Sequence, residues 1–200
     1  RVFPSQRALD QWLEEKPFSP GMREKISQAV PPTKRVADDV VVALDLKNGT
    51  TLWKASLPGT PSGRSSSSTP CIRDGKLYTV GSNRIFSVDL AKGKVDWETP
   101  LELDGIAGSV LVHNDLVIAL VGNLRAYHRE SGKLAWTNKQ VSGKSASPTL
   151  WKTQQKEFIA CNGGKAVFLV DPRDGTTFGT GPGGGSSTPV CQGEWMLVHG

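Results

Sequence analysis

The sequence contains a short motif that recurs four times, and this repetition limits the possible folds more than any other feature. Each copy has a glycine. In three copies an aspartate lies four residues before it, and in three a tryptophan lies four residues after it. The motif residues are Asp45, Gly49 and Trp53; Asp89, Gly93 and Trp97; Gly132 and Trp136; and Asp171 and Gly175. The glycines are 44, 39 and 43 residues apart. A period of this length predicts an array of similar supersecondary units.

A second feature repeats in phase with the first. Ser68-Thr69-Pro70 corresponds to Ser187-Thr188-Pro189, and Ser147-Pro148-Thr149 is a looser copy. Ser109-Val110 takes the equivalent place without the proline. Two landmarks that keep the same phase indicate that the whole segment between them is repeated.

Each unit holds four short runs with strand character. In the best-defined unit they are residues 69–73, 76–80, 85–90 and 94–98, with a tight turn at Asp74-Gly75. Four antiparallel strands in about 40 residues, repeated, are typical of a propeller blade. The sequence therefore predicts an all-β fold, a β-propeller of four-stranded antiparallel blades with about four repeat units. We expect these units to be part of a seven- or eight-bladed ring. A four-bladed ring closed by the two incomplete end units is the alternative.

The motif residues have a structural explanation. Aspartates at the end of the third strand can accept hydrogen bonds from turn amides. The glycines supply a positive φ for entry into the fourth strand. Each tryptophan would fill the gap between neighbouring blades with a large apolar surface. The serines before the first strands suit the crowded axis of a propeller. We therefore predict a structural role for the motif and no catalytic, cofactor-binding or metal-binding residues.

Residues 1–38 lack the repeat, and their apolar residues have the spacing of helices instead of strands. Leu9, Trp12 and Leu13 have helical spacing, and Met22 and Ile26 suggest a second helix that begins at Pro20. We expect a helical lead or linker over residues 1–38 and the propeller repeats over residues 39–200. The lead could be a linker, a helical cover on the repeats, or a docking arm for a partner.

Composition excludes several classes of protein. The net charge is +5, from 24 Lys and Arg against 19 Asp and Glu, and the excess is spread thinly along the chain. Nucleic-acid binding is not predicted, because it would need a concentrated basic patch. No apolar run approaches 18 residues, so no transmembrane helix is predicted.

Catalytic and metal-binding motifs are not found. Three cysteines lie at least 30 residues apart, and the histidines lack paired spacing; these are Cys71, Cys161 and Cys191, and His113, His128 and His199. Residues 179–184 match G-x-G-x-x-G, but Pro182 interrupts the match and a strand follows instead of a helix. We interpret this segment as a loop between blades.

The repeated motif resembles the tryptophan-docking repeat of the pyrroloquinoline-quinone (PQQ)-like β-propellers. The Ser-Thr-Pro elements, the run Asp74-Gly75-Lys76-Leu77-Tyr78 and the Gly-Lys-x-x-Trp elements resemble the BamB-like members of that superfamily. The resemblance covers residues 38–200. His128 replaces the motif aspartate in the third copy, and Phe178-Gly179 replaces the tryptophan region in the fourth.

The resemblance implies a function as well as a fold. BamB-like proteins have a periplasmic or outer-membrane-associated role in assembly. We therefore expect a non-catalytic scaffold in the cell envelope that binds protein partners through its blade loops and top surface. No cofactor is expected. One alternative is a fragment of a PQQ-dependent dehydrogenase, a class that uses a calcium-bound quinone, a catalytic aspartate and an adjacent cysteine pair; this sequence has no such pair. Another is a glycan- or small-ligand-binding propeller, suggested by Trp151 and Trp195.

Overall fold

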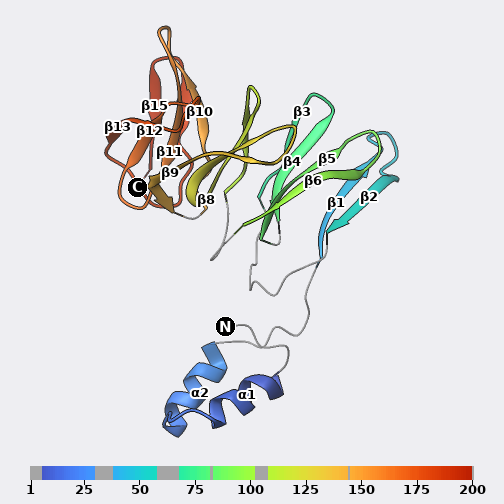
Figure 1. The fold of residues 1–200 in the computed structure, drawn as a ribbon, viewed down its shortest axis with the longest axis vertical. Helices are drawn as coiled ribbons and strands as arrows, with labels where there is room; N and C mark the ends of the chain where they lie inside the picture. Colours follow the sequence, from blue (N-terminus) through green and yellow to red (C-terminus); the bar gives the residue numbers. More distant parts are fainter. Residues whose placement is uncertain are drawn as a thin grey trace.

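The computed structural model describes residues 6–29, 38–57, 68–81, 83–101, 108–143 and 145–199. Its elements are two short helices followed by strands that form separate antiparallel sheets. Figure 1 shows these sheets standing side by side in an open arc. The structure confirms the predicted propeller architecture of repeated antiparallel blades, and the arc is not closed into a ring.

The first complete sheet, blade I, corresponds closely to the predicted unit. It contains β3 (Cys71–Arg73), β4 (Lys76–Gly81), β5 (Arg84–Asp89) and β6 (Lys94–Pro100), paired in that order. Asp74 and Gly75 have φ values of 47° and 74°, which a tight turn with the twist of a β-hairpin requires.

The other sheets repeat this plan in whole or in part. Blade II contains β7 (Leu111–His113), β8 (Leu116–His128) and β9 (Leu134–Gly143). Blade III contains β10 (Thr149–Lys152), β11 (Glu157–Asn162), β12 (Val167–Val170) and β13 (Thr177–Gly181). An N-terminal half-blade, β1 (Asp39–Leu44) and β2 (Thr51–Leu57), precedes them, and a C-terminal half-blade, β14 (Val190–Gln192) and β15 (Trp195–Leu197), follows.

Blade II differs from the predicted four strands. The strand β8 pairs with β7 through residues 116–118 and with β9 through residues 122–127, so it covers two strand positions. Gly122, in its middle, has a φ of 82°. Gly122 allows a tight turn of the chain at this point. The second and third strands of the blade therefore follow each other without a break, and together they form β8.

Apolar side chains are buried between neighbouring blades. One cluster joins the N-terminal half-blade to blade I through residues that include Ala55, Leu57 and Phe86. A second joins blades I and II, and a third joins blades II and III. Because each sheet packs on the next, the blades stabilise one another in sequence along the arc.

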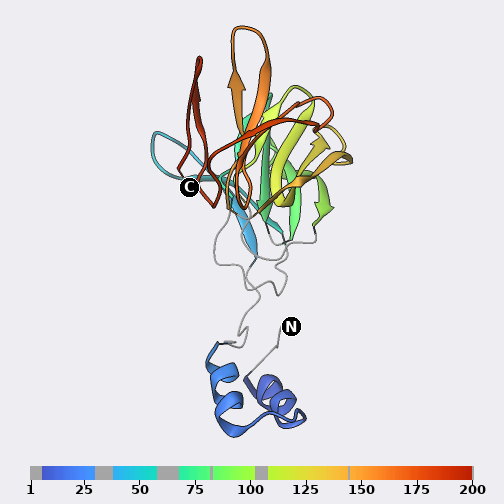
Figure 2. The ribbon, with the colours of Figure 1, turned by 90° about the vertical axis from the view of Figure 1, so that its left-hand side faces the viewer.

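The two helices, α1 (Gln6–Glu14) and α2 (Pro20–Ala29), pack on each other. Leu9 and Leu13 are buried there against Trp12, Phe18 and Ile26. Figures 1 and 2 show the pair set apart from the sheets. Neither described helix is long and apolar enough to cross a membrane.

Candidate functional site

The motif tryptophans link each blade to the one that follows. The indole Nε1 of Trp53 donates to the carbonyl of Leu90 at 2.8 Å, and that of Trp97 donates to the carbonyl of Arg129 at 2.9 Å. Trp136 makes the equivalent bond to the carbonyl of Pro172 at 3.2 Å. In each case the acceptor is the residue directly after the Asp or His position of the next motif copy, so the contact repeats with the unit.

The motif glycines receive the indole rings. A Cβ atom added to Gly93, Gly132 or Gly175 would lie 2.4–2.6 Å from the nearest ring atom of Trp53, Trp97 or Trp136, respectively. These glycines also have positive φ values, 63°, 67° and 77°. Two independent requirements therefore select glycine, and the sequence indicated only the backbone one.

The motif carboxylates cap the turns in which they lie. Asp45 Oδ1 accepts from the amide of Lys47 at 2.7 Å, and Asp89 Oδ1 accepts from the amides of Ala91 and Lys92, both at 2.9 Å. Asp171 Oδ1 accepts from the amide of Arg173 at 3.0 Å. The structure places these aspartates in three different sheets and does not bring them together.

The third motif copy keeps its turn without a carboxylate. The amide of Gly132 donates to the carbonyl of His128 at 2.8 Å, as Gly93 donates to Asp89 in blade I. The His128 side chain instead points to Asp115, with Nδ1 at 3.8 Å from Oδ2. The backbone bond and the positive φ of Gly132 are therefore sufficient to form this turn.

The fourth copy departs further from the motif. Gly179 occupies the register position that the tryptophans hold in the other blades, opposite Leu169. The neighbouring Phe178 is exposed and packs against Phe158 in a tilted arrangement, with ring centroids 4.9 Å apart. Lys156 Nζ lies 4.9 Å from the Phe178 ring centroid, a cation–π contact.

Two junction residues were not identified from the sequence. Asn138 is buried and its Nδ2 donates to the carbonyl of Gly175 and to Thr177 Oγ1, both at 2.8 Å. Its Oδ1 accepts from the amides of Gln140 and Val141. Thr99 makes the simpler equivalent contact, donating to the carbonyl of Gly132. Both lie two residues after a motif tryptophan, a spacing that could have signalled their role.

The serine and threonine residues that precede the first strand of each sheet form a chain of hydrogen bonds from one sheet to the next. The amide of Thr69 donates to Ser109 Oγ, the amide of Ser109 donates to Ser147 Oγ, and the amide of Ser147 donates to Thr188 Oγ1, at 2.9–3.1 Å. These side chains tie each sheet to the next, a specific contact beyond the small size that the sequence indicated.

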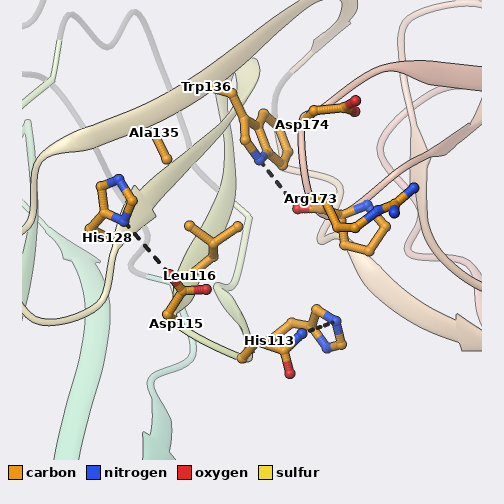
Figure 3. Close-up of a pocket in the computed structure, with 10 residues that line it drawn as sticks. His113, Asp115, Leu116, His128, Ala135, Trp136, Arg173 and Asp174 are labelled. Atoms are coloured by element: carbon orange, nitrogen blue, oxygen red, sulfur yellow. Dashed lines mark hydrogen bonds and ion pairs between the residues drawn. The ribbon is translucent and has the colours of Figure 1, made fainter.

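A cavity lies between blades II and III, and we call it the interblade groove (Figure 3). Its lining comes from the β7–β8 turn, the end of β8, strand β9 and the β12–β13 turn. The polar and aromatic members include His113, Asp115, His128, Trp136, Arg173 and Asp174. In Figure 3, His113, Asp115 and His128 lie across the groove from Arg173 and Asp174.

Polar side-chain contacts join the elements that form the walls of the groove. Arg173 binds Asp171 with Nη2 at 2.7 Å from Oδ2 and Nε at 3.0 Å from Oδ1. Lys156 Nζ lies 3.5 Å from Asp171 Oδ2. On the other wall, His113 Nε2 lies 3.2 Å from Glu157 Oε2, which joins blade II to blade III. The groove thus presents charges of both signs on a scaffold of short turns.

The ion pair at Asp171 predicts how stability depends on pH. The hydrogen bond from Arg173, together with the nearby Lys156 charge, holds the pKa of Asp171 well below its ordinary value. A depressed carboxyl pKa contributes stability above the pKa of the unfolded chain, about 4, and loses it as the pH falls through the folded pKa. We expect Asp171→Asn to lower the free energy of unfolding by about 1 kcal/mol at pH 7.

Urea unfolding of the two proteins at several pH values checks this expectation. The difference should persist at pH 5 and shrink below about pH 4, where the unfolded parent chain takes up its proton. Asp174→Asn, which changes the neighbouring exposed carboxylate, is the control and should lower the free energy of unfolding at pH 7 by less than Asp171→Asn does. A difference that stays constant down to pH 2 would contradict the assignment.

The described residues do not fit the quinone and calcium site that the resemblance to PQQ enzymes implies. A calcium site needs six or more oxygen ligands that converge on one point. The motif aspartates are separated and bonded to their own turns. Within the described ranges, no three His, Cys, Asp or Glu side chains gather in a way that could hold a metal ion. Cys71, Cys161 and Cys191 are free thiols.

Comparison with known proteins supports the fold. A family model described as "Outer membrane protein assembly factor BamB" matches residues 37–182. No curated protein sequence matches the chain. Among solved structures, BamB from Moraxella catarrhalis is similar over 77% of this chain and 46% of its own, with 19% identity and a TM-score of 0.60.

Two further solved structures share the fold. Quinohemoprotein alcohol dehydrogenase from Comamonas testosteroni matches 61% of this chain and 22% of its own, with 19% identity and a TM-score of 0.50. The computationally designed Ika8 protein matches 78% of this chain and 50% of its own, with 13% identity and a TM-score of 0.53. The chain thus spans half or less of the length of each of these three structures.

Proposed function

The chain belongs to the family of outer membrane protein assembly factor BamB, and from this premise we propose that it is a non-catalytic propeller scaffold that binds protein partners during assembly in the cell envelope. The location that we propose is the periplasm, at the outer membrane. The observation that carries the proposal is the interblade groove, a cleft lined by acidic, basic and aromatic side chains on a face built from short turns. Acidic and basic side chains around an aromatic residue suit recognition of another protein.

The use of the repeated motif supports a scaffold over an enzyme. The motif tryptophans dock on the following blade, and the motif aspartates cap turns within their own sheets. None of these groups is directed at a common point where a substrate could react. The motif side chains are thus used to build the arc, and the turns between its strands present Asp115 and Asp174 at the groove.

Capture of envelope proteins tests the proposal. The intact chain, immobilised and incubated with an envelope extract, should retain a defined partner that can be identified by mass spectrometry. Asp115→Lys reverses an exposed charge at the rim of the groove and should reduce retention about tenfold or more, because close charge reversals at interfaces are costly.

A matched control makes the result specific. Glu14→Lys makes the same charge change on an exposed position of α1, away from the groove, and should retain the partner like the parent chain. Equal retention by the two variants would show that the groove is not the contact surface. Absence of any stable partner, with oxidation of an alcohol on addition of PQQ and calcium, would favour the dehydrogenase alternative.

A further inference from the structure

Charged side chains fill the junction between blades I and II at the place that corresponds to the interblade groove. Arg129, in the β8–β9 turn, donates from Nη1 to Oδ2 of Asp74, in the β3–β4 turn, at 2.5 Å. The Arg129 side chain is only 20% exposed, so most of it is packed into the junction. Within blade I, Lys76 Nζ binds Asp96 Oδ2 at 2.7 Å. An arginine of the next blade thus bridges this junction.

A proline takes the place of this arginine at the next junction. Pro172 and Arg129 both lie directly after the first residue of their motif turn, and the carbonyl of each accepts a hydrogen bond from the motif tryptophan of the preceding blade. The turn on the opposite side is also equivalent, since Asn114 has a φ of 50° where Asp74 has a φ of 47°. The junction between blades II and III therefore keeps this backbone arrangement without the bridging arginine.

Two further charged side chains are replaced by apolar ones. Lys76 pairs with the last residue of β3 and Leu116 pairs with the last residue of β7, so Leu116 holds the place of Lys76. Ala135 holds the place of Asp96, because each directly precedes a motif tryptophan. Leu116, Ala135 and Pro172 all line the interblade groove. The groove therefore lies where the first junction holds an ion pair and an arginine side chain.

The groove keeps carboxylates that can bind a cation. The Asp115 side chain is 78% exposed, and its ion pair with His128 Nδ1 is long, at 3.8 Å. Asp174 is also exposed, and in Figure 3 it lies across the groove from Asp115. In the part of the chain that the structure describes, neither carboxylate forms an ion pair with a lysine or arginine. Arg173 is itself bound to Asp171 through two N–H groups, which balances its charge within the wall.

We propose that the interblade groove binds an arginine side chain of a partner protein, in the place that corresponds to that of Arg129 in the preceding junction. This inference rests on the proposed function, because it names the chemistry of the partner that the scaffold binds. A guanidinium group can bind the Asp115 carboxylate while its planar surface lies on the Trp136 indole. A lysine ammonium lacks this planar surface and fits the site less well.

Nuclear magnetic resonance on the isotope-labelled 200-residue chain tests the site with N-acetyl-arginine amide as the probe. The assigned indole N–H signal of Trp136 should shift saturably, with a dissociation constant on the order of 1 mM for so small a ligand. N-acetyl-citrulline amide has nearly the same shape without the charge, and it should bind about tenfold more weakly. N-acetyl-lysine amide should also bind more weakly than the arginine probe.

Two variants and a control locate the probe. Asp115→Asn removes one carboxylate and should weaken binding of the arginine probe about tenfold. Glu14→Gln makes the same change at an exposed position of α1 and should bind the probe like the parent chain. The double variant Asn114→Asp, Pro172→Arg copies the Asp74 and Arg129 pair into the second junction. Its own arginine should fill the groove and abolish probe binding, while circular dichroism shows an unchanged fold.

Three results would overturn the proposal. The citrulline or lysine probe could bind as tightly as the arginine probe, Asp115→Asn could bind it like Glu14→Gln, or the folded double variant could bind it like the parent chain. Capture of envelope proteins separates this inference from the proposed function. A partner that is retained through Asp115, without binding of the arginine probe, would overturn only the arginine assignment. Probe binding without any captured partner would keep the arginine site and contradict the scaffold.

Discussion

Replacing Gly132 with alanine should lower the free energy of unfolding by about 3–5 kcal/mol, whereas the same change at Gly49 should cost only about 1–2 kcal/mol. Both glycines have nearly the same backbone conformation, with φ values of 67° and 72°. They differ in what a methyl group would meet. At Gly132 the new Cβ would lie 2.4 Å from Trp97 Cε3, and at Gly49 it would meet nothing within 4 Å.

The pair of variants separates two physical effects that act together at Gly132. Gly49→Ala measures the cost of a positive φ in a residue with a Cβ atom. The additional loss at Gly132→Ala measures displacement of the indole, including the bond from Trp97 Nε1 to the carbonyl of Arg129. Denaturant titration followed by tryptophan fluorescence gives both values. Equal losses at the two positions would show that the docked indole adds no constraint.

Replacing Asn138 with alanine should lower the free energy of unfolding by about 2–4 kcal/mol. The side chain is 7% exposed and makes four hydrogen bonds, two within β9 and two to the β12–β13 segment. Its removal would leave the amides of Gln140 and Val141 and the carbonyl of Gly175 without this partner. Unsatisfied buried polar groups of this kind are expensive.

A neighbour on the same strand provides the control. Gln140→Ala truncates an exposed amide side chain two residues away and should change stability by less than about 0.5 kcal/mol. Thermal and denaturant unfolding of the three proteins would compare them directly. A loss at Asn138 no larger than that at Gln140 would mean that water replaces the four bonds without cost.

Much of the fold could be predicted because its signals are local. The spacing of the motif glycines and the alternation within each run indicated the blades, and β3 to β6 lie at or within a few residues of their expected ranges. The Asp74-Gly75 turn follows from residue types that tolerate a positive φ. The continuous strand β8 was not expected, since Gly122 was not recognised as a turn within it.

The candidate site was less accessible to prediction. The interblade groove combines the β7–β8 turn with the β12–β13 turn, nearly 60 residues further along the chain. His113 and Glu157 come from different sheets, and no spacing in the sequence links them. Asn138 resembles an ordinary strand residue until its partners in the next blade are known.

By itself, the sequence determined the repeat, the strands of a blade and the residues of its turns, because these depend on backbone conformation and on hydrogen bonds between near neighbours. Only the tertiary structure decided which carbonyl each tryptophan reaches, which glycine lies under its ring and which side chains line the groove. These contacts join residues more than 30 positions apart, and they form only when one sheet packs on the next. The tertiary structure also decides how far the strands at the ends of the arc are exposed, because an edge strand is open or covered according to what lies beside it.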